Sequence, residues 1–182
     1  MSAYLRWMAL LPLNCVVLVS AYLLSPILPL FASKDGWLPK CLWWYQTPDN
    51  PLDGDYGFRM IHAPFKGEDL SYWKKYINRM FWMIRNPSYG FDWTVLAFNP
   101  EPGYVLKVVR GSHPIGGDTT IDGYYHAILT NPNGSKAWQL YVIHHWNKTR
   151  YAKIDLGWRL WQAPNVCQYM SNPFSVWKFR DV

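Results

Sequence analysis

The sequence predicts an α+β fold, in which an N-terminal membrane anchor precedes one antiparallel β-meander domain covered by one amphipathic helix. Three patterns predict it: an uncharged run near the N-terminus, one segment with helical periodicity, and several segments that alternate with period two. Apolar residues make up 50% of the chain, so the part beyond the anchor can bury a core. The expected domains are the anchor (1–33), an interfacial aromatic segment and turn-rich linker (34–56), and the sheet and helix domain (57–182).

The uncharged run covers residues 7–33, between Arg6 and Lys34. As a helix it would reach about 40 Å, which exceeds the ~30 Å hydrocarbon core of a bilayer. A secretory signal peptide is the alternative, since Arg6 supplies a positive start and Cys15 to Leu24 supplies an apolar centre. The apolar residues continue to Phe31, however, and no good cleavage site of small residues follows, which favours an uncleaved anchor.

Three prolines, Pro12, Pro26 and Pro29, interrupt the run. Each removes a backbone donor, so the helix should be kinked near both ends or regular only from Leu13 to Ser25. A tilted span and a shallow re-entrant segment both agree with this pattern. Lysine and arginine are more numerous after the run than before it, so the positive-inside tendency places the domain on the cytoplasmic side.

An aromatic segment follows the run, where the chain should leave the bilayer. The residues expected at the membrane interface are Trp37, Trp43, Trp44 and Tyr45. Packing of Trp43 and Trp44 into the domain core is the alternative. Residues 46–55 contain turn formers and aspartates but lack the ligand pattern of an EF-hand loop, so we expect turns there and no metal site.

The clearest helical pattern runs from Asp69 to Arg85. Its apolar residues recur at steps of three and four, as in an amphipathic helix; they are Leu70, Trp73, Ile77, Met80, Phe81 and Ile84. Asp69 can cap the start, and Asn86 with Pro87 ends the helix. We expect the apolar face to cover one face of the sheet. A basic amphipathic helix that lies on a membrane is the alternative.

The remainder alternates with period two between turns that contain Pro, Gly and Asn, which is typical of an antiparallel meander. The expected strands are Trp93–Phe98, Tyr104–Arg110, Tyr124–Thr130, Ser135–Trp146 and Arg150–Trp161. For the last pair, a three-residue loop at 147–149 gives an entirely apolar face. This register pairs Trp138 with Trp158, Leu140 with Leu156 and Val142 with Ile154.

The other face of that strand pair is polar and aromatic, and we expect it to bind a partner. The register sets Tyr141 opposite Asp155, and a type I turn at 131–134 would add the side chains at 124 and 126. The candidate binding residues are His126, Tyr141, His145, Tyr151 and Asp155. An ordinary half-solvated sheet face with satisfied tyrosines and histidines is the alternative.

Motifs of the common enzyme classes are missing from the sequence. It has no nucleophile elbow, phosphate-binding glycine loop or dinucleotide fingerprint, so no catalytic residue and no cofactor are predicted. His144 and His145 would point to opposite faces of a strand and cannot hold one metal ion. The net charge of +6 suits several partners, but the basic stripe is thin and a nucleic-acid partner is not expected. Cys41 and Cys167 are expected to stay reduced.

Four segments carry a family likeness: Gly36–Pro39, Tyr45–Asp55, Arg85–Phe91 and Leu156–Leu160. Together they resemble an uncharacterised family of small tailed-bacteriophage proteins, a domain of unknown function. The likeness spans most of the chain after the anchor. It implies a phage protein in a bacterial host, located at the host inner membrane. It implies no catalytic residue, because that family has no settled activity.

Two classes of function agree with these observations. The first is a membrane-tethered phage accessory protein that binds a partner in the host envelope or the virion, with the lipid bilayer as a further partner. The second is an envelope-modifying enzyme that uses His126 or His145 with Asp155 as an acid–base pair. A secreted or virion structural protein is another alternative. The anchor and the lack of catalytic motifs favour the first.

Overall fold

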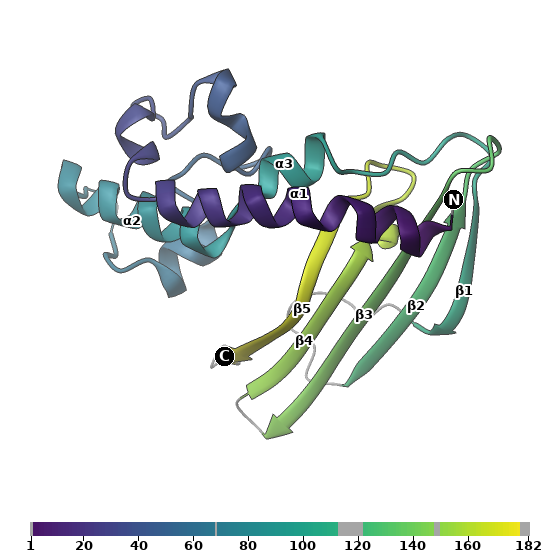
Figure 1. Cartoon of the computed structure of the whole chain (residues 1–182). Helices are drawn as coiled ribbons and strands as arrows, with labels where there is room; N and C mark the ends of the chain where they lie inside the picture. Colours follow the sequence, from purple (N-terminus) through teal and green to yellow (C-terminus); the bar gives the residue numbers. More distant parts are fainter. Residues whose placement is uncertain (1, 68, 113–121, 148–149, 179–182) are drawn as a thin grey trace. The chain divides into compact units, whose positions relative to one another are not determined.

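The computed structural model describes residues 2–67, 69–112, 122–147 and 150–178, and Figure 1 shows its elements. The fold is α+β, with an apolar N-terminal helix and one open antiparallel sheet, as predicted. The chain divides into two compact units. We call Met1–Leu11 with Leu96–Val182 the sheet unit, and Pro12–Val95 the helical unit.

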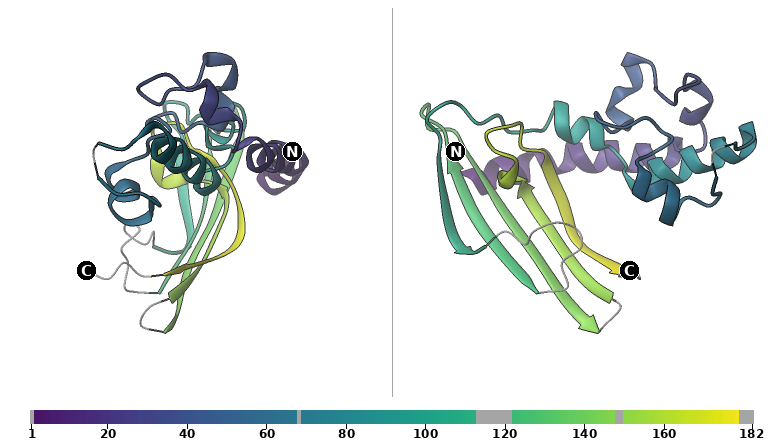
Figure 2. Two further views of the ribbon diagram at one scale, coloured as in Figure 1. Left: turned by 90° about the vertical axis from the view of Figure 1, so that its left-hand side faces the viewer. Right: turned by 180° about the vertical axis from the view of Figure 1, so that it is seen from behind.

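The sheet is a five-stranded meander whose strands lie in sequence order, with β1 and β5 at opposite edges (Figure 2). The strands are β1 (Val105–Gly111), β2 (Gly123–Thr130), β3 (Lys136–Asn147), β4 (Arg150–Trp158) and β5 (Tyr169–Lys178). The first four agree with predicted segments, except that the predicted strand Arg150–Trp161 already ends at Trp158. The alternation did not predict β5, which contains Pro173, a residue that weakens a strand pattern.

The predicted strand Trp93–Phe98 is wrong. Trp93 lies in the short helix α3 (Tyr89–Thr94), whose first turn contains Asp92, and an acidic residue is favourable there. Phe98 forms an isolated bridge with Cys167.

The predicted register of β3 and β4 is confirmed. The observed pairs include Leu140 with Leu156, Tyr141 with Asp155, Val142 with Ile154 and His145 with Tyr151. The connection differs from the expected three-residue loop, because Asn147 pairs with Arg150 and the ladder shifts between His145 and Asn147. This irregularity supplies the extra residue that the loop would have supplied, so the inner pairs are the same.

The hairpin between β2 and β3 is one residue longer than the predicted type I turn. The Asn131 N–H donates to the Ser135 carbonyl (2.9 Å) and closes it. The additional residue is Gly134, with a positive φ of 82°, a conformation that glycine adopts without steric cost.

The additional turn residue changes which face the β2 side chains occupy, because a slip of one residue moves each of them to the other face. His126 pairs with Leu140 and Tyr124 with Val142. The expectation that these two β2 side chains share a face with Tyr141 is therefore wrong.

One face of the sheet packs on the first turns of α1 (Ala3–Leu24). The rings of Tyr4 and Trp7 lie 4.8 and 5.5 Å from that of Trp138. The Trp7 indole N–H donates to the Met170 carbonyl (2.9 Å). Further along this face, the predicted apolar residues are only half-buried; they are Leu140, Val142, Ile154 and Leu156.

The opposite face, for which the sequence predicted partner binding or an ordinary half-solvated surface, is the more deeply buried one. It buries Gln139, Tyr141, Ile143 and Asp155. After β4 the chain turns back as the short helix η4 (Leu160–Gln162), and the ring of Trp161 lies 5.1 Å from that of Tyr141. The Gln139 side-chain oxygen accepts the Leu160 N–H (2.8 Å), which fixes η4 over the sheet.

The helical unit has its own core. Its further elements are η1 (Leu28–Phe31), η2 (Lys40–Tyr45), η3 (Phe58–His62) and α2 (Tyr72–Arg85). The buried cluster consists of Leu28, Leu38, Leu52, Phe58, Ala63, Trp82 and Met83. Helix α1 contains Pro12 in its interior, and Pro26 and Pro29 follow its end.

The buried face of α2 is not the predicted one. Asn78, Arg79, Trp82 and Met83 are buried, whereas Trp73 is 66% exposed and Phe81 and Ile84 are exposed as well. The buried Trp82 and Met83 pack in the core of the helical unit. Periodicity predicts an amphipathic helix, but buried polar contacts decide which face turns inward.

The cross-strand pair of Leu129 and Leu106 offers a matched test of the sheet. Leu129 is 0% exposed and Leu106 is 38% exposed. We expect Leu129→Ala to lower the free energy of unfolding by ~2–5 kcal/mol through loss of packing and cavity formation. Leu106→Ala should cost less than ~1 kcal/mol. Equal losses in denaturant unfolding of the two variants would contradict the described burial.

Candidate functional site

Helix α1 is long and apolar enough to serve as a membrane span or a signal sequence. Within the helical unit, its polar side chains contact the unit itself. Asn14 is buried and donates to Asp92 Oδ1 (2.5 Å), and the Ser20 hydroxyl lies 3.1 Å from that of Tyr45. One face of this part of α1 is therefore occupied by protein.

The other face of α1 exposes apolar side chains that continue into η1. The exposed residues are Val16, Val19, Leu23, Ile27, Leu30 and Phe31. Their spacing of three and four places those of the helix along one stripe. A stripe of this kind in contact with water is unfavourable, whereas in contact with acyl chains it is not.

The predicted interfacial aromatic residues differ in exposure. Trp37, Trp43 and Trp44 are exposed, while Tyr45 is half-buried and packs against the core of the helical unit. The Trp43 indole N–H donates to the Leu38 carbonyl (3.0 Å), which holds the ring in place.

Helix α2 adds a second exposed apolar face to the helical unit. Trp73, Phe81 and Ile84 are exposed on it, together with Tyr72. The exposed Lys74 follows Trp73 directly. Aromatic and basic residues together on a helix are typical of helices that lie at a membrane interface, which is the alternative that the sequence left for this segment.

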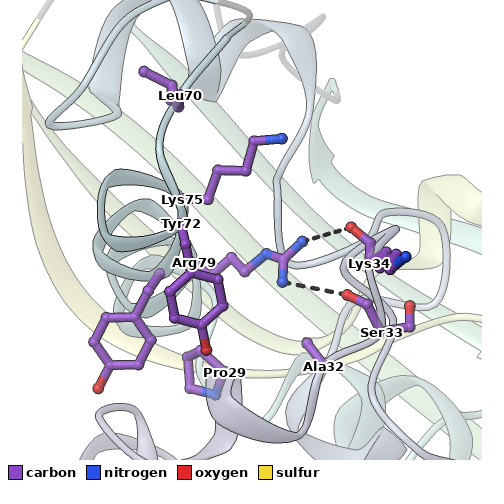
Figure 3. A pocket seen from close by; sticks show the side chains of 9 residues that line it. Pro29, Ala32, Ser33, Lys34, Leu70, Tyr72, Lys75 and Arg79 are labelled. Carbon is purple, nitrogen blue, oxygen red and sulfur yellow. Dashed lines mark hydrogen bonds between the residues drawn. The ribbon is translucent and has the colours of Figure 1, made fainter.

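Arg79 is the polar centre of this unit, and Figure 3 shows its guanidinium between α2 and the segment after η1. Its Nε and Nη2 donate to the two carboxylate oxygens of Asp53 (2.7 and 2.9 Å). Its Nη1 and Nη2 donate to the carbonyls of Ser33 (3.3 Å) and Lys34 (3.0 Å). The Arg79 side chain is only 8% exposed and that of Asp53 is 30% exposed, so this bidentate pair is largely shielded from solvent.

In the sheet unit, four of the five predicted binding residues share one face: Tyr141, His145, Tyr151 and Asp155. The fifth, His126, lies on the other face, where its Nε2 is 3.0 Å from the Tyr4 hydroxyl. Tyr141 and Asp155 are buried, whereas Tyr151 is half-buried.

Asp155 belongs to a buried charged cluster. Its carboxylate lies 3.4 Å from Arg159 Nε and 3.9 Å from Lys153 Nζ, and it accepts a hydrogen bond from Gln139 (3.3 Å). Burial raises the pKa of Asp155, and the two cations oppose that rise. Burial also lowers the pKa of Lys153, which the Asp155 carboxylate opposes. The opposite charges of these groups compensate one another, as in a structural network of ion pairs.

Burial likewise raises the pKa of a tyrosine hydroxyl and of a thiol in the sheet unit. It raises the pKa of Tyr141 to about 12, with a further contribution from the Asp155 charge. It raises the pKa of Cys167 to about 12, so that thiol is a poor nucleophile. The three cysteines Cys15, Cys41 and Cys167 are free.

Sequence reasoning missed Asp122, which joins the two adjacent histidines. Its Oδ1 lies 2.7 Å from His145 Nδ1 and accepts the His145 N–H (2.7 Å), and its Oδ2 lies 2.8 Å from His144 Nδ1. The backbone hydrogen bond from His145, followed by the contacts of the side chains, lowers the pKa of Asp122 to about 2. No group of His, Cys, Asp or Glu with metal-binding geometry occurs among the described residues.

The chain matches a family model over residues 1–180, and the model describes a family of unknown function, DUF7338. The chain belongs to this family. The expectation of an uncharacterised family is thereby confirmed. No curated protein and no solved structure matches the chain.

The Arg79 pair can be tested by comparing two arginines of the helical unit. We expect Arg79→Ala to lower the free energy of unfolding by about 3 kcal/mol, the lower end of the range for breaking a buried ion pair, because Asp53 keeps contact with solvent. Arg59 is exposed and donates to the Gly54 carbonyl (2.9 Å), so Arg59→Ala should cost about 1 kcal/mol. Equal costs in denaturant unfolding would show that Arg79 does not organise the unit.

Asp122 predicts a specific dependence on pH. Its pKa is lowered in the folded state, so its contribution to stability is present above pH 3.8 and is lost as the pH falls towards about 2. Wild type should therefore lose more thermal stability than Asp122→Asn between pH 4 and pH 2. Coincident profiles of melting temperature against pH for the two proteins would contradict this contact.

Proposed function

We propose that the protein is a membrane-attached accessory protein that acts by contact, in which the helical unit attaches to a bilayer and the sheet unit binds a partner. The observation that carries this proposal is the exposed apolar surface of the helical unit, to which α1, η1 and α2 all contribute. Soluble monomers rarely expose apolar surface on this scale without a partner or a membrane to cover it.

The polar contacts of α1 favour attachment to one leaflet over a complete span. A helix that crosses a bilayer alone is surrounded by lipid, and buried polar side chains there need partners. Asn14 and Ser20 find theirs in Asp92 and Tyr45 of the helical unit. An α1 that keeps these contacts lies along the interface, with Val16, Val19 and Leu23 towards the acyl chains.

Binding, as opposed to turnover, is supported by the chemistry of the sheet unit. Asp155 is fully buried and held by Gln139 and Arg159, and His126 occupies the other face, so the expected acid–base pair with this histidine has no support. Near the predicted surface, the aromatic side chain of Trp146 is exposed and that of Tyr151 is half-buried. Aromatic side chains contribute much of the binding energy at protein interfaces.

The resemblance of four segments to a family of tailed-bacteriophage proteins supports a phage context for this role. On that basis the membrane is the inner membrane of the bacterial host, with the sheet unit on its cytoplasmic side, and the partner is a protein of the host envelope or the virion. Attachment to a membrane would raise the effective concentration of the sheet unit towards such a partner.

Membrane attachment is tested with a triple variant, Val16→Asp, Val19→Asp and Leu23→Asp. These side chains are exposed, so the helical unit should still fold, as circular dichroism would verify. The matched control is Val105→Asp, Val108→Asp and Val109→Asp on the exposed strand β1. We expect wild type and control to float with vesicles, and the α1 variant to do so at least tenfold less. Wild type that stays soluble without detergent, or a mature chain that begins near Ser33, would refute the attachment.

The contact role is tested by crosslinking in cells that contain the partner membrane or virion. Tyr151→Ala should reduce the yield of a crosslinked envelope or virion protein several-fold, whereas Lys107→Ala on the distant edge strand should not. Turnover of an envelope substrate by the purified protein would contradict a purely binding function.

A further inference from the structure

A cavity of about 420 Å³ lies between η1 and the start of α2 in the helical unit (Figure 3). This volume falls within the usual range of small-ligand sites. Its lining residues come from two segments far apart in the sequence; they are Pro29, Ala32, Ser33, Lys34, Leu70, Tyr72, Lys75, Tyr76 and Arg79.

The charge of the cavity is positive. Lys34, Lys75 and Arg79 line it, and none of its described lining residues is acidic. The Asp53 carboxylate compensates the charge of Arg79, whose Nε lies 2.7 Å from Asp53 Oδ1. The two exposed lysines therefore supply the net positive charge of the cavity. Figure 3 shows the Arg79 side chain extending from α2 towards the carbonyls of Ser33 and Lys34, with the Lys75 side chain extending from the same helix. Such an arrangement favours an anionic ligand.

The fixed geometry around Arg79 makes this a built site. The guanidinium holds the carbonyls of Ser33 and Lys34, so it sets the position of the Lys34 backbone relative to α2. The Tyr76 hydroxyl donates to the Pro26 carbonyl and holds the end of α1 against the same helix. These hydrogen bonds fix the backbone of the two lining segments relative to each other.

Exposed apolar side chains next to the lining residues in the sequence indicate what kind of anion the cavity would take. Leu30 and Phe31 are exposed on η1, between the lining residues Pro29 and Ala32. Tyr72 and Trp73 are exposed at the start of α2. A free inorganic anion would use the lysines alone, whereas a phospholipid would use both the lysines and these apolar side chains.

We propose that this cavity binds the phosphate headgroup of an anionic phospholipid, with Lys34 and Lys75 on the phosphate and the acyl chains against Leu30, Phe31 and Trp73. The site rests on the proposed membrane attachment and adds a lipid preference to it. Basic pockets beside an apolar membrane element are a recurrent means of headgroup recognition.

The test measures lipid retention by the full chain in detergent, by native mass spectrometry. Wild type should retain phosphatidylglycerol in preference to phosphatidylcholine. The double variant Lys34→Ala and Lys75→Ala should retain about 30-fold less phosphatidylglycerol, since each lysine near an anionic headgroup contributes roughly a factor of five. The matched control is Lys107→Ala with Lys136→Ala, because these lysines line another cavity, of about 490 Å³, in the sheet unit. The control should retain wild-type levels.

Three outcomes would overturn the site: equal retention of the two lipids by wild type, undiminished retention by the Lys34 and Lys75 variant, or complete displacement of the lipid by millimolar inorganic phosphate. The last would assign the cavity to a free anion. Thermal unfolding of each variant verifies that the exposed lysines can be removed without loss of the fold. Vesicle flotation of wild type separates this site from the proposed function. Attachment to vesicles without a lipid preference would refute the proposed lipid site and leave the proposed membrane attachment intact.

Discussion

The hydrogen bonds of Arg79 are the constraint on which the helical unit depends. A buried guanidinium requires several acceptors, and here Asp53 and the carbonyls of Ser33 and Lys34 provide them. These hydrogen bonds hold the segments that carry the acceptors against α2. Asn78, one residue earlier, exchanges two hydrogen bonds with the backbone of Phe65 in the same manner. Together the two side chains tie the loops of the unit to one helix.

This polar anchoring has a direct consequence for the surface. Because Asn78 and Arg79 must face inward, the residues on the far side of α2 face outward, including Trp73 and Phe81. Helix α2 therefore buries two polar side chains beside Trp82 and Met83 and exposes aromatic ones, which differs from the usual arrangement of a soluble helix. A bilayer offers an apolar environment in which such a surface costs little, so the buried polar contacts of α2 and the proposed membrane attachment are connected.

The sheet unit also buries hydrogen-bonded polar side chains, on one face of its sheet. Gln139, Asp155 and Gln168 are almost completely buried, and Arg159 connects Asp155 to Gln168 by a 2.8 Å hydrogen bond to the latter. The network joins β3, β4, η4 and the residue before β5, and it holds the returning chain over the sheet. Buried networks of this kind are costly unless each member is satisfied, so they specify one arrangement of the strands. Tyr141 is enclosed by the same arrangement, which leaves Tyr151 as the more accessible of the two tyrosines.

The sequence by itself determined the elements that depend on local chemistry and on the periodic spacing of apolar residues. The uncharged run predicted α1, the three- and four-residue spacing predicted the α2 helix, and alternation predicted four strands with the pairing of Tyr141 and Asp155. It also predicted the family of unknown function, through four short segments.

Tertiary structure decided which faces are buried and which candidate residues meet. One additional turn residue, Gly134, moved His126 away from the candidate face, because strand faces alternate with every residue. Asp122 reached His144 and His145 from 22 and 23 residues away, and Arg79 reached the carbonyl of Ser33 from 46 residues away. Periodicity records only local spacing, so it contains no information about such distant partners. These partners determine which face of a helix or strand is buried.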